Sequence, residues 1–134
     1  MLRVKTRVGV SAIHGLGLFA DEFIPQGTIV WDFDPGFDHR LPIEAVRERA
    51  AKDPIFAAFA RRAGYEEKHT PNFIIFDFDD GRFMNDSTEP TCYLSGLQSI
   101  AARDIHPGEE LTERYEDFLI DNETAVAIRW RMRG

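Results

Sequence analysis

Three short segments of the chain carry residue types that can take part in ligand binding or catalysis. They read His-Gly-Leu-Gly-Leu-Phe over 14–19, Arg-Phe-Met-Asn-Asp-Ser over 82–87 and Glu-Glu-Leu-Thr-Glu-Arg-Tyr over 109–115. Glycine has no Cβ, so a backbone strip around Gly15 and Gly17 can approach a ligand closely. The amide of Asn85 donates and accepts hydrogen bonds, and the hydroxyl of Tyr115 can orient an amine. Each segment also has an ordinary alternative: a β-turn, a polar turn and a buried aromatic side chain.

Other familiar chemistries are excluded or disfavoured by the sequence. The Gly15-Leu16-Gly17 turn is not a dinucleotide-binding fingerprint, because the third glycine and a following helix are absent. Ser87 is interpreted as a turn donor rather than a nucleophile, since no histidine lies nearby in sequence to activate it. Cys92 is the only cysteine, which excludes an intramolecular disulfide and a Cys-rich zinc site. No metal site is expected, because the four histidines have no metal-ligand spacing.

In their order and spacing the three segments resemble the SET domain, the fold of most protein-lysine methyltransferases that use S-adenosylmethionine. The resemblance runs from about Val4 to Phe118. It implies a β-rich α+β fold of small sheets around a knot-like core, with one helical insert at about 42–64 that borders the substrate groove. It implies methyl transfer to a lysine ε-amine of a protein or peptide. The alternatives are an inactive SET-like module that binds a peptide, the cofactor or both, and an unrelated β-rich domain.

The resemblance also implies roles for individual residues. The strip at 14–17 would lie against the methionine part of the cofactor, Asn85 would hold its ammonium end, and the backbone at Asp86 would meet the adenine. The full set expected to bind S-adenosylmethionine is His14, Gly15, Leu16, Gly17, Arg82, Asn85, Asp86 and Tyr115. Tyr115 matches the tyrosine that borders the lysine channel, and it is the predicted catalytic residue. The lysine must lose a proton from a free pKa of about 10.4, and an apolar channel favours that loss.

At some positions the sequence departs from the family pattern. Asp86 stands where the family usually has histidine, and Thr91 where it has asparagine. Glu113 replaces an aromatic residue two positions before Tyr115; it could point to solvent, bind a cationic substrate or mark lost activity. The missing aromatic side chain could come from Tyr93, Phe118 or Trp130. Trp130 could instead stack on adenine, or pack in the core or a dimer interface.

The apolar pattern predicts short strands and two helices that would position these motifs. Strands are predicted over 4–10, 28–31, 73–78, 97–101, 110–112 and, less clearly, 124–132. Residues 34–40 are predicted to form a loop, and Asp80-Gly81 a hairpin turn into 82–84. Pro42 is predicted to open one helix, and Asp53-Pro54 to end it and begin a second that stops at Gly64.

Length and charge bound the remaining possibilities. With 134 residues and 43 % hydrophobic composition, the chain is expected to form a single SET domain over 1–134, closed by a segment at about 119–134. Many SET-domain proteins close the C-terminal side of the domain with a Cys-rich zinc site. In this chain Thr88 stands at the position of one of the cysteine ligands of that zinc. The net charge of −7 disfavours nucleic acid and fits a basic, lysine-bearing partner.

The expected location and assembly follow from the same composition. No apolar stretch is long enough to cross a bilayer and no signal peptide is evident, so a soluble, intracellular protein is expected. A homodimer that uses Val126, Ile128 and Trp130 could complete the substrate groove, although these side chains could equally close the core of the monomer.

Overall fold

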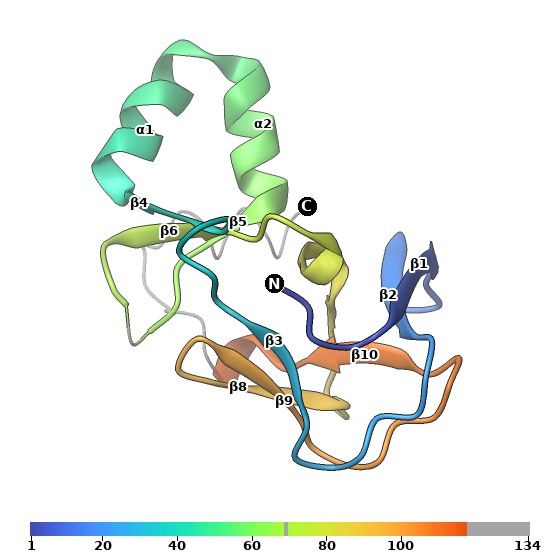
Figure 1. The fold of residues 1–134 in the computed structure, drawn as a ribbon. Coiled ribbons are helices and arrows are strands. Elements are labelled where there is room, and N and C mark those ends of the chain that lie inside the picture. The colour runs from blue at the N-terminus through green and yellow to red at the C-terminus, as the bar shows by residue number, and fades with distance from the viewer. Residues whose placement is uncertain (69, 118–134) are drawn as a thin grey trace.

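The structure, a computed structural model, describes residues 1–68 and 70–117. Within these residues the chain forms ten strands in three small sheets, two α-helices and two short 3-10 helices (Figure 1). This is the β-rich α+β class expected from the sequence. None of the helices in the described part of the chain is long and apolar enough to cross a membrane. The predicted strand at 124–132 and residues Phe118, Val126, Ile128 and Trp130 lie outside the described residues.

The first sheet brings together the three motif segments. Its order is β1 (Thr6–Val10), β2 (Leu16–Ala20), β10 (Glu110–Glu113) and β7 (Asn85–Asp86). Strand β10 runs antiparallel to β2 and parallel to β7, so it joins the glycine segment to the asparagine segment. The short parallel strand β7 was not predicted, since two polar residues carry no strand pattern of their own.

The second sheet packs against the first and contributes to the main core. It contains β3 (Ile29–Asp32), β9 (Gln98–Ala101) and β8 (Cys92–Ser95), all antiparallel. Strand β8 was not predicted from the sequence. The core that spans the first two sheets contains the fully buried side chains Leu18, Ala20, Ile24, Val30, Met84, Cys92, Ala101, Ile105 and Leu111.

The third sheet supports the helical insert, which projects away from the other two sheets (Figure 1). It pairs β4 (His39–Pro42) and β5 (Gly64–Tyr65) with the central β6 (Phe73–Phe76). The helices α1 (Ile43–Lys52) and α2 (Pro54–Ala63) follow the predicted bounds closely. Asp53 caps α2, because its side chain accepts the backbone N–H groups of Ile55 and Phe56, each at 3.0 Å.

Two local predictions were wrong. Residues His39 and Arg40 belong to strand β4 rather than to a loop, because pairing with β6 holds them extended. Asp80–Phe83 forms the 3-10 helix η1 instead of a hairpin turn. The side chain of Asp79 accepts the N–H of Gly81 at 3.0 Å, which starts a helical turn where the sequence pattern indicated a reversal between strands.

Candidate active site

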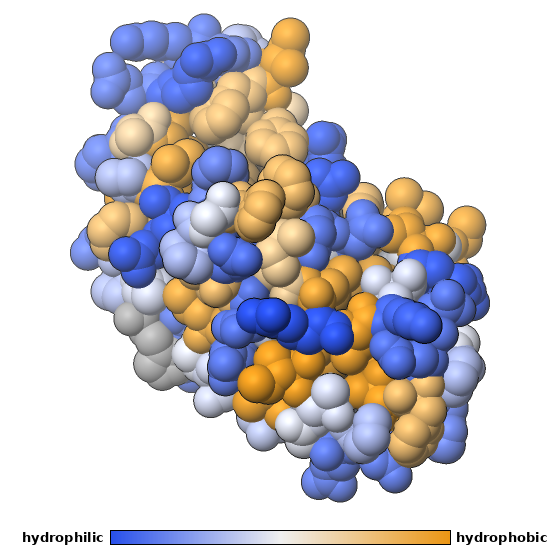
Figure 2. Space-filling view, in the orientation of Figure 1, coloured by the Kyte–Doolittle hydropathy of each residue, from blue (hydrophilic) through white to orange (hydrophobic). Residues whose placement is uncertain are grey.

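A cleft lies between helix α2 and the tip of the β1–β2 hairpin, where Figure 2 shows the surface hollowed. Its volume is about 370 Å³, within the range of small-molecule sites. It is lined by His14, Gly15, Leu16, Phe59, Arg62, Ala63, Arg82, Phe83, Asn85 and Tyr115. Most of the residues predicted to bind the cofactor are therefore brought together around one cleft, although they come from three distant parts of the chain.

Asn85 holds the glycine strip in place. Its Nδ2 donates to the carbonyl oxygens of His14 at 3.0 Å and Leu16 at 3.1 Å. Gly15, between them, has a φ of +48°, a conformation that favours glycine. With both amide hydrogens directed at the strip, Oδ1 is the atom of this side chain that can accept a hydrogen bond from a ligand.

Gly17 and Asp86 are predicted site residues that do not line the cleft. A Cβ on Gly17 would lie 2.5 Å from Oε1 of Glu110, so a larger residue at this position would require the Glu110 side chain to move. Oδ1 of Asp86 accepts the backbone N–H of Tyr115 at 2.8 Å. The main chain of Asp86 was expected to meet the adenine, whereas its side chain contacts the segment that carries the predicted catalytic residue.

Tyr115 lies at the inner wall of the cleft and is only 7 % exposed. Its hydroxyl donates to the backbone carbonyl of Met84, which follows η1. Its ring belongs to a small buried cluster with Tyr65 and Ile75. These contacts from three elements hold both ends of the side chain in one orientation.

The insert contributes residues that the sequence argument missed. Phe59, Arg62 and Ala63 lie on one face of α2 and line the cleft opposite the glycine strip. Phe59 is stacked on Phe76 of β6, with ring centroids 5.7 Å apart. The shared face of Phe59 and Ala63 is visible in the sequence as helical spacing, but its direction toward the cleft depends on how α2 packs on the third sheet.

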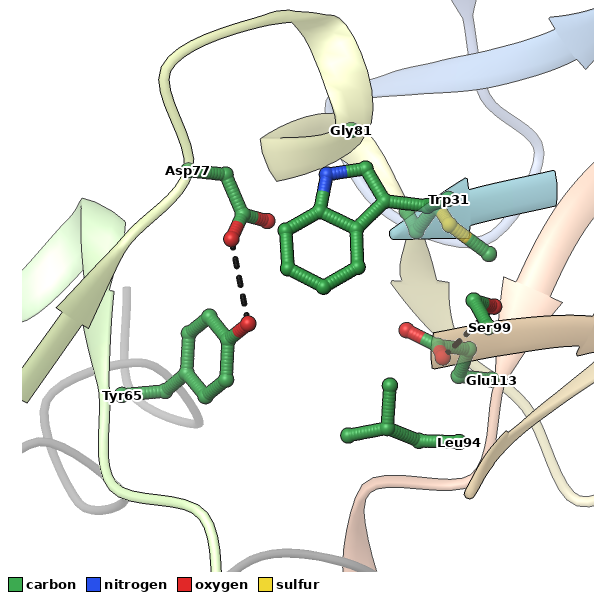
Figure 3. Close-up of a pocket in the computed structure, with 8 residues that line it drawn as sticks. Trp31, Tyr65, Asp77, Gly81, Leu94, Ser99 and Glu113 are labelled. Atoms are coloured by element: carbon green, nitrogen blue, oxygen red, sulfur yellow. Dashed lines mark hydrogen bonds between the residues drawn. The ribbon is translucent and has the colours of Figure 1, made fainter. Parts of the chain in front are cut away.

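A second, smaller pocket is lined in part by Met84 and Glu113. Figure 3 shows Glu113 on one side of it. It is lined by Trp31, Tyr65, Asp77, Gly81, Met84, Leu94, Ser99 and Glu113. Glu113 is 7 % exposed and accepts a hydrogen bond from Oγ of Ser99 at 2.9 Å. The possibility that Glu113 points to solvent is thereby excluded.

Cys92 lies close to this pocket but is chemically inert. It is fully buried in the main core. Burial, and secondly the charge of Glu113, raise the pKa of the Cys92 thiol to about 12. The thiol therefore stays protonated at neutral pH and cannot serve as a nucleophile.

The family model that describes the SET domain matches residues 15–116. The chain belongs to the SET-domain family. That match contains all three motif segments except His14, and with the same exception it contains the residues that line both pockets. No curated protein sequence matches the chain.

Solved structures support the same fold. The SET domain here resembles a Plasmodium falciparum protein described as a candidate histone methyltransferase, with a TM-score of 0.59 and 19 % identity over 85 % of this chain and 95 % of that one. It also resembles the Ezh2-containing ctPRC2 complex, with a TM-score of 0.67 and 20 % identity. A humanised mutant of the Chaetomium thermophilum Polycomb Repressive Complex 2 bound to GSK126 gives a TM-score of 0.63 and 20 % identity. In both complexes 88 % of this chain covers 16 % of the other chain.

Thr91, which replaces the asparagine expected in a SET domain, has a structural role in this chain. Its backbone N–H donates to Oγ1 of Thr112 at 3.1 Å, and its own Oγ1 accepts the N–H of Thr112 at 2.9 Å. The same hydroxyl donates to the carbonyl of Glu110 at 3.1 Å. Thr91 thus connects the start of β8 to β10, and its buried hydroxyl is fully hydrogen-bonded.

Proposed function

We propose that this SET domain transfers a methyl group from S-adenosylmethionine to a lysine ε-amine of a protein or peptide. The observation that carries the proposal is the cleft between α2 and the glycine strip, with Asn85 and Tyr115 in its wall. Membership of the SET family supports methyltransferase chemistry. The names of the similar structures make basic, histone-like peptides the first substrates to test.

The donor set of the cleft fits the cofactor. Oδ1 of Asn85 can accept from an ammonium group, and Arg62 and Arg82 place cationic side chains beside the cleft for a carboxylate. The rings of Phe59 and Phe83 offer apolar faces for a nucleobase. When bound, S-adenosylmethionine supplies an electrophilic methyl group on a sulfonium centre.

The chain's own residues would orient the acceptor and exclude water. Tyr115 is buried and fixed by Met84 and Asp86, so its ring and hydroxyl would form a rigid surface for positioning a reacting amine. Rigid alignment of two reactants and removal of water are the main contributions that such a transfer requires. The proposed role of Tyr115 is therefore positioning of the amine against the methyl group.

Binding and transfer are tested separately. Calorimetry with S-adenosylhomocysteine should show binding, and Asn85→Ala should weaken it by roughly 1–3 kcal/mol, as expected for a hydrogen bond to a charged group. Thermal unfolding of the same variant is the control, because Asn85 also holds the glycine strip. Absence of binding by the parent protein at millimolar ligand would contradict the proposed cofactor.

Methyl transfer is then measured with radiolabelled S-adenosylmethionine on basic peptides and host lysate. Label on lysine supports the enzyme, whereas cofactor binding without transfer favours the inactive, peptide-binding module. The net charge of −7 supports a basic partner. A single domain over 1–134 and a homodimer remain proposals; sedimentation that shows a monomer at tens of micromolar would contradict the dimer.

A further inference from the structure

The cleft between α2 and the glycine strip, the hollow seen in Figure 2, carries positive charge in an otherwise acidic chain. Arg62 in the last turn of α2 and Arg82 of η1 both line it, and so does His14. None of the described residues that line the cleft is an aspartate or glutamate, although the chain has 23 acidic residues against 16 lysines and arginines. Because a cleft concentrates the field of the charges in its walls, this one favours anionic ligands.

Neither arginine is neutralised within the part of the chain that the structure describes. No carboxylate there lies within ion-pair distance of Arg62 or Arg82. The guanidinium of Arg82 instead lies over the ring of Phe83, 4.9 Å from its centroid. Ion pairs with carboxylates hold most of the other described arginines, namely Arg3, Arg47, Arg49, Arg103 and Arg114. The donors of Arg62 and Arg82 are therefore free for a ligand, and the guanidinium fork matches the oxygens of a phosphate group.

The charge of the cofactor does not match two free arginines. S-adenosylmethionine has one carboxylate and two positive groups, the ammonium and the sulfonium. One guanidinium can pair with the carboxylate, whereas the second faces a ligand whose remaining charges have the same sign as its own. Like charges brought together in a cleft disfavour binding. A ligand with the same adenosine part and several negative charges in place of the sulfonium would pair with both arginines.

The rest of the cleft suits an adenosine group. Phe59 and Phe83 both line it, and the ring of Phe59 is held by stacking on Phe76, with centroids 5.7 Å apart. Aromatic rings offer stacking faces to a nucleobase. The volume of about 370 Å³ is within the range of small-molecule sites. The cleft therefore combines apolar faces for a base with two cationic groups, from two different elements, for a phosphate chain.

We infer that the cleft also binds adenosine phosphates, with phosphate oxygens held by Arg62 and Arg82, in competition with S-adenosylmethionine. The inference rests on the proposed function, because competition requires the cofactor to bind in the same cleft, and it assigns a form of regulation to that site. ADP or ATP in the cleft excludes the cofactor and stops methyl transfer without any covalent step. Methylation then decreases as adenosine phosphates increase relative to the cofactor.

Calorimetry with the parent protein tests binding without any need for turnover. The ligands are adenosine, AMP, ADP, ATP and inorganic tripolyphosphate, with EDTA present so that no divalent cation masks the phosphates. Affinity should rise about tenfold or more from adenosine to ADP, because each phosphate adds charge that faces the arginines. Tripolyphosphate should bind at least about tenfold more weakly than ATP, because it lacks the base. Added salt should weaken the binding of ATP much more than that of adenosine.

Substitution of the two arginines tests the location of the site. Arg62→Gln and Arg82→Gln should each weaken ADP binding about tenfold or more and leave adenosine binding close to that of the parent. Arg40→Gln is the matched control: its guanidinium lies over the ring of Phe73 at the same 4.9 Å, but Arg40 does not line the cleft. All three arginines are exposed, so thermal unfolding should change little. Unchanged ADP affinity in both cleft variants would overturn the site.

Competition is measured by titrating S-adenosylhomocysteine in the presence of increasing ADP. The apparent Kd of S-adenosylhomocysteine should rise in proportion to the ADP concentration, and a Kd independent of ADP would overturn the shared cleft. Equal affinity for ATP and tripolyphosphate would overturn recognition of the nucleoside.

The outcomes separate this inference from the proposed function. Binding of S-adenosylhomocysteine without binding of ADP overturns the inference and leaves the proposed function intact. Binding of ADP without binding of S-adenosylhomocysteine contradicts the proposed cofactor and the competition, and the Arg62→Gln and Arg82→Gln variants then decide the nucleotide site alone. In an active parent, ADP should raise the KM for S-adenosylmethionine and leave kcat unchanged; a fall in kcat at constant KM would contradict competition.

Discussion

The backbone N–H of Tyr115 donates to Oδ1 of Asp86 at 2.8 Å, which links the residue proposed for catalysis to the strand of the asparagine motif. The contact joins the end of β10 to β7, the parallel pair at the edge of the first sheet. Asp86 stands where the family pattern has histidine, and the contact gives the carboxylate a positioning function. The departure at this position is therefore compatible with an ordered site.

Replacement of Asp86 should test that positioning. Asp86→Ala removes the acceptor, so we expect a loss of about 1 kcal/mol in the free energy of unfolding and slower methyl transfer. Asp86→Asn keeps Oδ1 and should remain close to the parent in both properties. Denaturant unfolding and initial rates measure the two effects. Equal rates for Asp86→Ala and the parent would show that the contact does not position Tyr115.

Tyr115→Phe should impair transfer more than folding. The change removes only the hydroxyl and leaves the carbonyl of Met84 without that donor, so stability should fall by about 1–2 kcal/mol. Cofactor affinity should change little, whereas turnover should fall roughly tenfold or more. Tyr93→Phe is the matched control, because Tyr93 is 45 % exposed. A folded Tyr115→Phe protein that methylates at the parent rate would remove the hydroxyl from the mechanism.

Gly81→Ala should disturb the pocket at Glu113. A Cβ at Gly81 would lie 2.8 Å from Cδ1 and 3.0 Å from Nε1 of Trp31, whose buried ring cannot easily move. We expect a loss of about 1–3 kcal/mol in stability, as for overpacking of a core. The indole signal of Trp31 should also shift in NMR spectra. Gly9→Ala has looser contacts, 3.3 Å or more, and is the control; a similar cost for both variants would contradict the steric explanation.

Cys92 should make folding stability fall at alkaline pH. The folded thiol has a pKa raised to about 12, whereas the unfolded thiol ionises near its ordinary value. Above about pH 9 the unfolded state therefore loses a proton that the folded state keeps, which destabilises the fold by about 1.4 kcal/mol per pH unit. Urea unfolding under reducing conditions between pH 8 and 10.5 measures this slope. Cys92→Ala should show a shallower slope, and equal slopes would rule out the thiol as its cause.

Local structure was largely predictable where neighbouring residues decide it. Asp53 and Pro54 carry the signal that ends α1 and begins α2, and the structure shows the cap that this signal implies. The Phe73–Phe76 strand is β-branched and aromatic throughout, so its pattern is strong. The prediction failed at Asp80-Gly81, where the side chain of Asp79 starts a 3-10 turn from just outside the dipeptide.

The motif residues could be named from sequence, but their functions depend on contacts between distant segments. The sequence by itself determined the family, the helical insert and the residues of the glycine and asparagine segments, because these are properties of residue order and spacing. Only the tertiary structure decided that Asn85 fastens the glycine strip, that α2 forms the other wall of the cleft, and that Glu113 is buried opposite Asp77. The physical reason is that burial and charge environment arise when strands far apart in sequence pair, and no local pattern contains that pairing.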